Sequence, residues 1–66
     1  MYSLIGIENK CFAIMDYVMS AMREQKFTEL EIHKYINDAH SGDFDNLLKV
    51  SNEMLDRCNE RMIEPE

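Results

Sequence analysis

The first apolar pattern along the chain recurs at helical spacing over residues 4–24. A second, shorter stripe beside it carries Ile5, Phe12 and Met19. With successive residues about 100° apart, the two stripes together cover roughly 160° of the helix surface, against the ~100° of an ordinary surface helix. This width predicts a long helix that faces two partners. The main stripe consists of Leu4, Ile7, Cys11, Ile14, Met15, Val18, Ala21 and Met22.

A second helix is predicted over residues 28–40. Thr28 and Glu31 have the spacing of a capping box, in which each side chain accepts a hydrogen bond from the other residue's backbone N–H. Gly42 follows the last apolar turn, and glycine accepts the left-handed conformation that often ends a helix. The sequence therefore predicts a short helix that ends at a left-handed Gly42.

A third helix is predicted over residues 43–63. Asp43 can cap its first backbone amides, and Asp45 suits the positive end of the helix dipole. Ser51 interrupts the apolar stripe, where a polar residue can fix the register of packing. The stripe consists of Phe44, Leu47, Leu48, Met54, Leu55, Cys58 and Met62.

These patterns predict an all-α fold in which one domain covers residues 1–66, with two long helices and one short connecting helix. Two arrangements are open: a hairpin of antiparallel long helices, and an up-down-up three-helix bundle. In the hairpin Cys11 and Cys58 come to similar heights, whereas in the bundle their sulfurs lie roughly 10 Å apart along the axis. We favour the antiparallel pair.

The length of the chain, 66 residues, predicts self-association. A domain of this size buries only about 60% of the surface that its unfolded chain exposes. Two cysteines are too few for a disulfide framework, so oligomerisation is the expected source of additional stability. We predict that Ile5, Phe12 and Met19 form the interface of a dimer or higher oligomer.

Acidic charge is concentrated in the second half of the chain. Residues 1–27 hold three basic and three acidic groups, whereas residues 28–66 hold four basic and ten acidic groups, which accounts for the net charge of -6. Such a field repels phosphate backbones and attracts basic surfaces. We therefore expect a basic protein partner and no direct binding of nucleic acid. The longest apolar run is far below the ~20 residues of a membrane span, and we expect a cytoplasmic protein without membrane contact.

Residues that could support chemistry are few. His40, Asp43 and Asp45 could together hold a divalent ion, but helix capping and the helix dipole explain each of them. Cys11 and Cys58 lie in apolar stripes, unlike a catalytic cysteine, which needs an exposed electropositive site. We therefore predict no metal site, no cofactor and no enzymatic activity.

The junction between the second and third predicted helices carries a recognisable pattern. It reads Ala39-His40-Ser41-Gly42-Asp43-Phe44-Asp45-Asn46-Leu47. This stretch resembles the helix-turn-helix junction of small uncharacterised helical proteins of bacteriophages and mobile elements. The resemblance implies an accessory protein, and it carries over no functional residue.

Two functions are compatible with these features. The first is a small, acidic, homo-oligomeric interaction protein that acts as an adaptor or inhibitor by binding another macromolecule. The alternative is an oligomeric small-molecule-binding protein, a ligand sponge with a pocket between subunits. There Tyr2, Tyr17 and Tyr35 could pack against a ring, and symmetry could bring Lys10 and Arg23 together.

Overall fold

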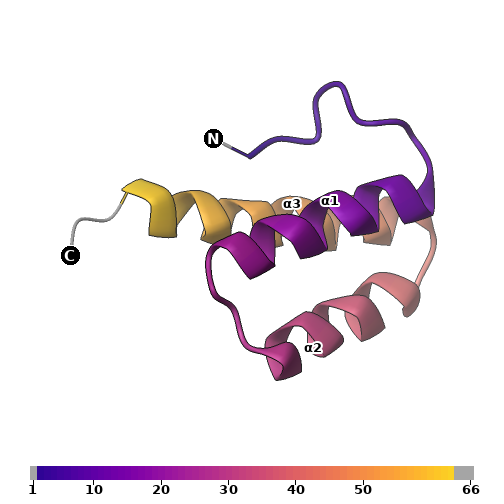
Figure 1. Ribbon diagram of the computed structural model, residues 1–66. Helices are drawn as coiled ribbons and strands as arrows, with labels where there is room; N and C mark the ends of the chain where they lie inside the picture. Colours follow the sequence, from indigo (N-terminus) through magenta and orange to yellow (C-terminus); the bar gives the residue numbers. More distant parts are fainter. Residues whose placement is uncertain (1, 64–66) are drawn as a thin grey trace.

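The computed structural model describes residues 2–63 and contains three α-helices that run up, down and up (Figure 1). They are α1 (Cys11–Glu24), α2 (Glu29–His40) and α3 (Phe44–Ile63). The helix α3 packs against both other helices, whereas α1 and α2 contact each other much less. No strand occurs within the described range. The predicted all-α class is confirmed.

The helix α1 begins at Cys11, so the predicted helix start at residue 4 is wrong. Residues 2–10 instead form an irregular strap that passes along the side of α1 and α3 opposite α2 (Figure 1). Gly6 has a φ of 89°, in the left-handed region that favours glycine. Lys10, which precedes the helix, has an extended backbone and provides no side-chain cap. The apolar spacing of this segment thus continues the helical pattern without forming a helix.

The strap is attached to the helices through its first described residue. The backbone N–H of Tyr2 donates to Oδ1 of Asn59 at 2.7 Å, and Nδ2 of Asn59 donates to the Tyr2 carbonyl at 3.0 Å. The Tyr2 ring also meets the ring of Tyr17 edge-on, with centroids 6.4 Å apart. Leu4 and Ile7 then pack against the core from the strap. Two apolar residues of the predicted first stripe therefore reach the core from an irregular backbone.

The helices α1 and α3 run parallel, so the favoured antiparallel pair is wrong. Their C-terminal ends meet where Nη1 of Arg61 donates to the carbonyl of Gln25 at 2.8 Å, and at the opposite end Cys11 and Leu47 line one cavity. Cys58 lies eleven residues beyond Leu47, roughly 16 Å along α3, so the two free thiols are at different heights. The helix α2 has 12 residues and α1 has 14, so α2 runs back along most of the length of α1. The chain is then at the N-terminal end of α1, where α3 begins.

Local capping at the starts of α2 and α3 is as predicted. The backbone N–H of Glu31 donates to Oγ1 of Thr28 at 3.2 Å, and the backbone N–H of Thr28 donates to Oε1 of Glu31 at 3.0 Å. The hydrogen bonds from the Thr28 backbone and hydroxyl lower the pKa of the Glu31 carboxyl. At α3, Oδ1 of Asp43 accepts from the backbone N–H of Asn46 at 3.0 Å. Both caps use contacts within four residues, which is why the sequence reveals them.

The expectation that Gly42 adopts a left-handed backbone is wrong. A glycine is needed there because the Asn46 side chain occupies the space that a side chain at position 42 would need. A Cβ atom at Gly42 would lie only 2.9 Å from Cβ of Asn46. The Asn46 side chain is fixed there because its Nδ2 donates to the carbonyl of Asp38 at 2.9 Å. Oγ of Ser41 donates to the same carbonyl at 2.7 Å, so this carbonyl in the last turn of α2 has hydrogen-bond partners outside the helix ladder. The α2–α3 junction thus leaves no room for a side chain at Gly42.

The end of α1 carries a left-handed residue that the sequence did not indicate. Lys26 has a φ of 63°, and its N–H donates to the carbonyl of Arg23 at 3.0 Å. The N–H of Phe27 donates to the carbonyl of Met22 at 3.0 Å. These two bonds form a Schellman motif, in which glycine is the usual left-handed residue. Here a lysine takes that position.

The core contains one buried polar pair. Oη of Tyr35 and Oγ of Ser51 lie 2.7 Å apart and share a hydrogen bond between α2 and α3. Burial raises the pKa of Tyr35. Ser51, the predicted break in the α3 stripe, therefore has a specific partner. The buried apolar residues are Ile14, Met15, Val18, Ala21, Met22, Phe27, Ile32, Tyr35, Ala39, Leu47, Leu55 and Cys58.

Candidate functional site

The three predicted interface residues lie in different environments. Phe12 exposes 76% of its surface on α1, and Ile5 exposes 92% in the strap. Met19 is half-buried and packs against the core. Because residue 5 precedes the helix, Ile5 does not continue the helical row of Phe12 and Met19. The structure therefore splits the predicted stripe into a strap residue and a row on α1.

The row on α1 includes charged residues. Asp16, Met19 and Arg23 follow Phe12 at four, seven and eleven positions, the spacings that place side chains on one face of a helix. We call these four residues the α1 face. Phe12, Asp16 and Arg23 are all exposed. Within residues 2–63, neither charged group of this face has an oppositely charged partner within 4.0 Å.

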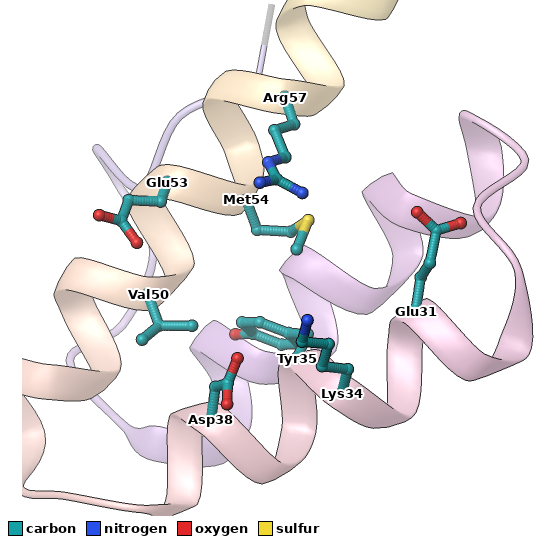
Figure 2. Close-up of a pocket in the computed structure, with 8 residues that line it drawn as sticks. All are labelled: Glu31, Lys34, Tyr35, Asp38, Val50, Glu53, Met54 and Arg57. Carbon is teal, nitrogen blue, oxygen red and sulfur yellow. The ribbon is translucent and has the colours of Figure 1, made fainter.

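A groove opens between α2 and α3 (Figure 2). Its cavity volume is about 270 Å³. Val50 and Met54 are half-buried and line it together with the edge of the buried Tyr35 ring. We call this cavity the α2–α3 groove. Its complete lining is Glu31, Lys34, Tyr35, Asp38, Val50, Glu53, Met54 and Arg57.

Charges of both signs surround the apolar part of the groove. Figure 2 shows Arg57 extending from α3 and Lys34 from α2 toward the space in front of Met54 and Tyr35. Both basic side chains are exposed, and within the described part of the chain neither has a carboxylate within 4.0 Å. The acidic lining residues come from both helices and are Glu31, Asp38 and Glu53.

A neighbouring arginine shows how this side of α3 holds an aromatic ring. Arg61, one helical turn beyond Arg57, places its guanidinium carbon 3.8 Å from the centre of the Phe27 ring. A cation above an aromatic face is attracted by the ring electrons. Arg57 has no such ring among residues 2–63. The groove therefore lies one helical turn from a position on α3 where an arginine already packs against an aromatic ring.

The side chains considered for a ligand pocket are not brought together within one chain. Tyr2 and Tyr17 contact each other, whereas Tyr35 lies in the core with its hydroxyl bonded to Ser51. Lys10 pairs with Glu8 at 3.5 Å. The groove that the structure does contain was missed from the sequence. Its residues come from two helices whose relative placement the apolar pattern left open.

The acidic and thiol groups show no metal centre among the described residues. No three His, Cys, Asp or Glu side chains in residues 2–63 are placed to share an ion. His40 and Asp43 line a second cavity of about 210 Å³ with Cys11, but the Asp43 carboxylate is engaged in capping α3. Burial raises the pKa of the Cys58 thiol. Within the same range, no helix has both the length and the apolar character needed to cross a bilayer.

No protein-family model matches this chain, and neither a curated protein nor a solved structure matches it. The functional assignment therefore depends on the surfaces described above. The α1 face and the α2–α3 groove both combine apolar side chains with charges that have no ion-pair partner among residues 2–63.

Proposed function

We propose that the protein is a small acidic interaction protein, which self-associates through α1 and acts as an adaptor or inhibitor by binding another macromolecule. The observation that carries this proposal is the exposed ring of Phe12, 76% of which is accessible in the single chain. Burying a side chain of this kind contributes about 1.5–3 kcal/mol. A second molecule that covers Phe12 would therefore stabilise a small fold.

The dimensions of the molecule support association. Its Cα atoms extend over 37 × 27 × 15 Å, so the shortest dimension is less than two helix-to-helix spacings of about 8–10 Å. The helix α3 has 20 residues against 14 in α1, and both Phe44 and Met62, near its two ends, are exposed. A body this thin cannot cover all of its apolar helix surface.

The charge of the outer surface supports a basic macromolecular partner. Three exposed carboxylates that do not line the groove, those of Asp45, Asp56 and Glu60, follow α3, with one such basic residue, Lys49, between them. Such a surface attracts basic surfaces and speeds their encounter at low salt. Self-association through α1 would leave this side of α3 available to a partner.

Light scattering behind a sizing column tests the self-association. We expect the wild-type chain to have a mass that is a multiple of 7.8 kDa and Phe12→Asp to have the monomer mass. Leu30→Asp is the matched control, because Leu30 is 80% exposed on α2 and should leave the mass unchanged. A wild-type mass of one chain, or equal masses for both variants, would contradict the proposal.

Retention of a partner on immobilised protein tests the second part of the proposal. Immobilised wild-type protein should retain a partner from a cell extract and lose it as salt is raised, because the expected contact is electrostatic. Reversing two acidic charges of α3, in Asp56→Lys and Glu60→Lys, should abolish retention while the mass of the oligomer stays the same. Retention that is insensitive to both salt and charge reversal would contradict a basic partner at this surface.

A further inference from the structure

The α1 face and the α2–α3 groove have complementary shapes within the same chain. Phe12 protrudes from the first turn of α1, and nothing in residues 2–63 covers most of its ring. The groove offers a cavity of about 270 Å³ between Met54 and the edge of Tyr35. Thioether sulfur and aromatic edges both make favourable contacts with an aromatic ring. The groove is therefore a suitable receptor for a phenyl ring.

One charge of the α1 face can pair with one charge of the groove, whose lining holds two basic and three acidic residues. Asp16 lies one turn after Phe12 on the same side of α1, and its carboxylate has no cation within 4.0 Å among the described residues. Arg57, in the groove, likewise has no carboxylate within that distance. A carboxylate facing a guanidinium forms the stronger, charge-assisted type of hydrogen bond.

The spacing of these groups agrees on the two helices. Phe12 and Asp16 are separated by four residues, about 6 Å along α1, and Met54 and Arg57 are separated by three residues, about 4.5 Å along α3. If the Phe12 ring lies against Met54, Asp16 can reach Arg57 when the two helices lie side by side. The flexible arginine side chain spans the remaining difference.

A symmetric contact between two α1 helices is less favourable. Phe12 of one copy would then pack on Met19 of the other, and the twofold axis would pass close to Asp16. The two Asp16 carboxylates would face each other across that axis. Like charges at such a distance repel, so electrostatics disfavours the symmetric contact.

We propose that the α1 face of one copy docks into the α2–α3 groove of a second copy, with Phe12 against Met54 and Asp16 against Arg57. The inference rests on the proposed self-association and names its receptor. Because each copy presents both surfaces, two copies that exchange the contact reciprocally form a closed dimer. A contact made in one direction only is heterologous, and it either closes into a ring or continues as a filament.

A charge-swap experiment tests the docking. Asp16→Arg and Arg57→Glu should each weaken association about tenfold or more in sedimentation equilibrium, and the double variant should recover most of it. Asp56→Arg and Lys49→Glu are the matched controls, because both residues are exposed on α3 and neither lines the groove. Their dissociation constants should equal that of the wild type.

Arg57→Gln provides a second variant of the groove, because it removes the charge without reversing it. It should weaken association by a smaller factor than Arg57→Glu while its thermal unfolding midpoint as a dilute single chain equals that of the wild type. Unchanged association in both Arg57 variants would overturn the docking.

A mixing experiment separates this inference from the proposed function. Phe12→Asp has an intact groove and Arg57→Glu has an intact Phe12. An equimolar mixture should therefore form mixed complexes in native mass spectrometry at a concentration where each variant alone is mostly monomeric. If Phe12→Asp is monomeric while Arg57→Glu associates as the wild type does, the groove is not the receptor and self-association through α1 stands. If the wild type itself is monomeric, both proposals fail.

Discussion

The contact between α2 and α3, which we call the α2–α3 seam, contains a buried hydrogen bond between Tyr35 and Ser51. The N-terminal strap is instead attached near the surface, through Tyr2 and Asn59. Capping contacts between residues close in sequence define the start of each helix of the seam. The strap contacts join residues 57 positions apart. The comparison suggests that the seam is the stable part of the fold and that the strap can open locally without unfolding it.

The largest expected effect is a cavity in the seam. Ile32→Ala removes a buried side chain from α2 and should lower the free energy of unfolding by about 2–5 kcal/mol. Ile7→Ala, at a half-buried position of the strap, should cost clearly less. Urea denaturation followed by circular dichroism measures both. Equal losses at the two positions would remove the distinction between seam and strap.

The next effect concerns the buried polar pair. Tyr35→Phe and Ser51→Ala each leave one buried hydroxyl without its partner and should cost about 1–3 kcal/mol. The double variant should cost less than the sum, because no unpaired hydroxyl then remains. Additive losses in this double-mutant cycle would show that the two hydroxyls do not interact.

The same pair predicts a pH dependence. Burial raises the pKa of Tyr35 above its value of 10.0 in the unfolded chain. The folded protein therefore holds this proton more tightly, and its contribution to stability is present below pH 10 and is lost as pH rises through the folded pKa. Tyr35→Phe should make the decline in unfolding free energy at alkaline pH shallower. An identical decline in the wild type and the variant would contradict burial of this hydroxyl.

A smaller and more local effect is expected at the strap. Asn59→Ala removes both hydrogen bonds to the Tyr2 backbone and should cost about 1 kcal/mol. The amide of Ser3, which donates to the Tyr17 hydroxyl, should then exchange with solvent faster, while amides of α2 keep their protection. Faster exchange throughout α2 would show that strap and seam open together.

The smallest effect is a stabilisation at the end of α1. A left-handed non-glycine residue costs about 1–2 kcal/mol, and glycine loses about 0.5–1 kcal/mol more chain entropy on folding, so Lys26→Gly should stabilise by about 0.5–1 kcal/mol. Gln25→Gly is the control, because Gln25 has a φ of -88° and should gain nothing. A thermal melt compares them, and a lower midpoint for Lys26→Gly would contradict the Schellman geometry.

The sequence predicted those parts of the fold that depend on near neighbours. The capping box of Thr28 and Glu31 and the cap at Asp43 involve residues three positions apart, so their chemistry is visible in the sequence. The strap was read as helix because its apolar spacing continues that of α1. Gly6 and the Tyr2–Asn59 contact, which joins distant residues, favour another backbone.

The arrangement of the helices and the candidate site were harder to predict from the sequence. The apolar stripes fit both orientations of α1 and α3, and the length of α2 relative to the true start of α1 decided between them. Phe12 is exposed, and its place in an interface stays a prediction. The groove around Met54 could not be predicted, because it depends on how α2 lies on α3. The apolar periodicity of one helix cannot reveal a cavity that forms between two helices.

The proposed assembly depends on Phe12 being covered by a second copy of the chain. Sedimentation equilibrium of the wild-type protein and Phe12→Asp over a hundredfold range of concentration tests it most directly. We expect a wild-type mass that rises above 7.8 kDa with concentration and a variant that stays at that value. A wild-type chain that remains at 7.8 kDa throughout the range would contradict it.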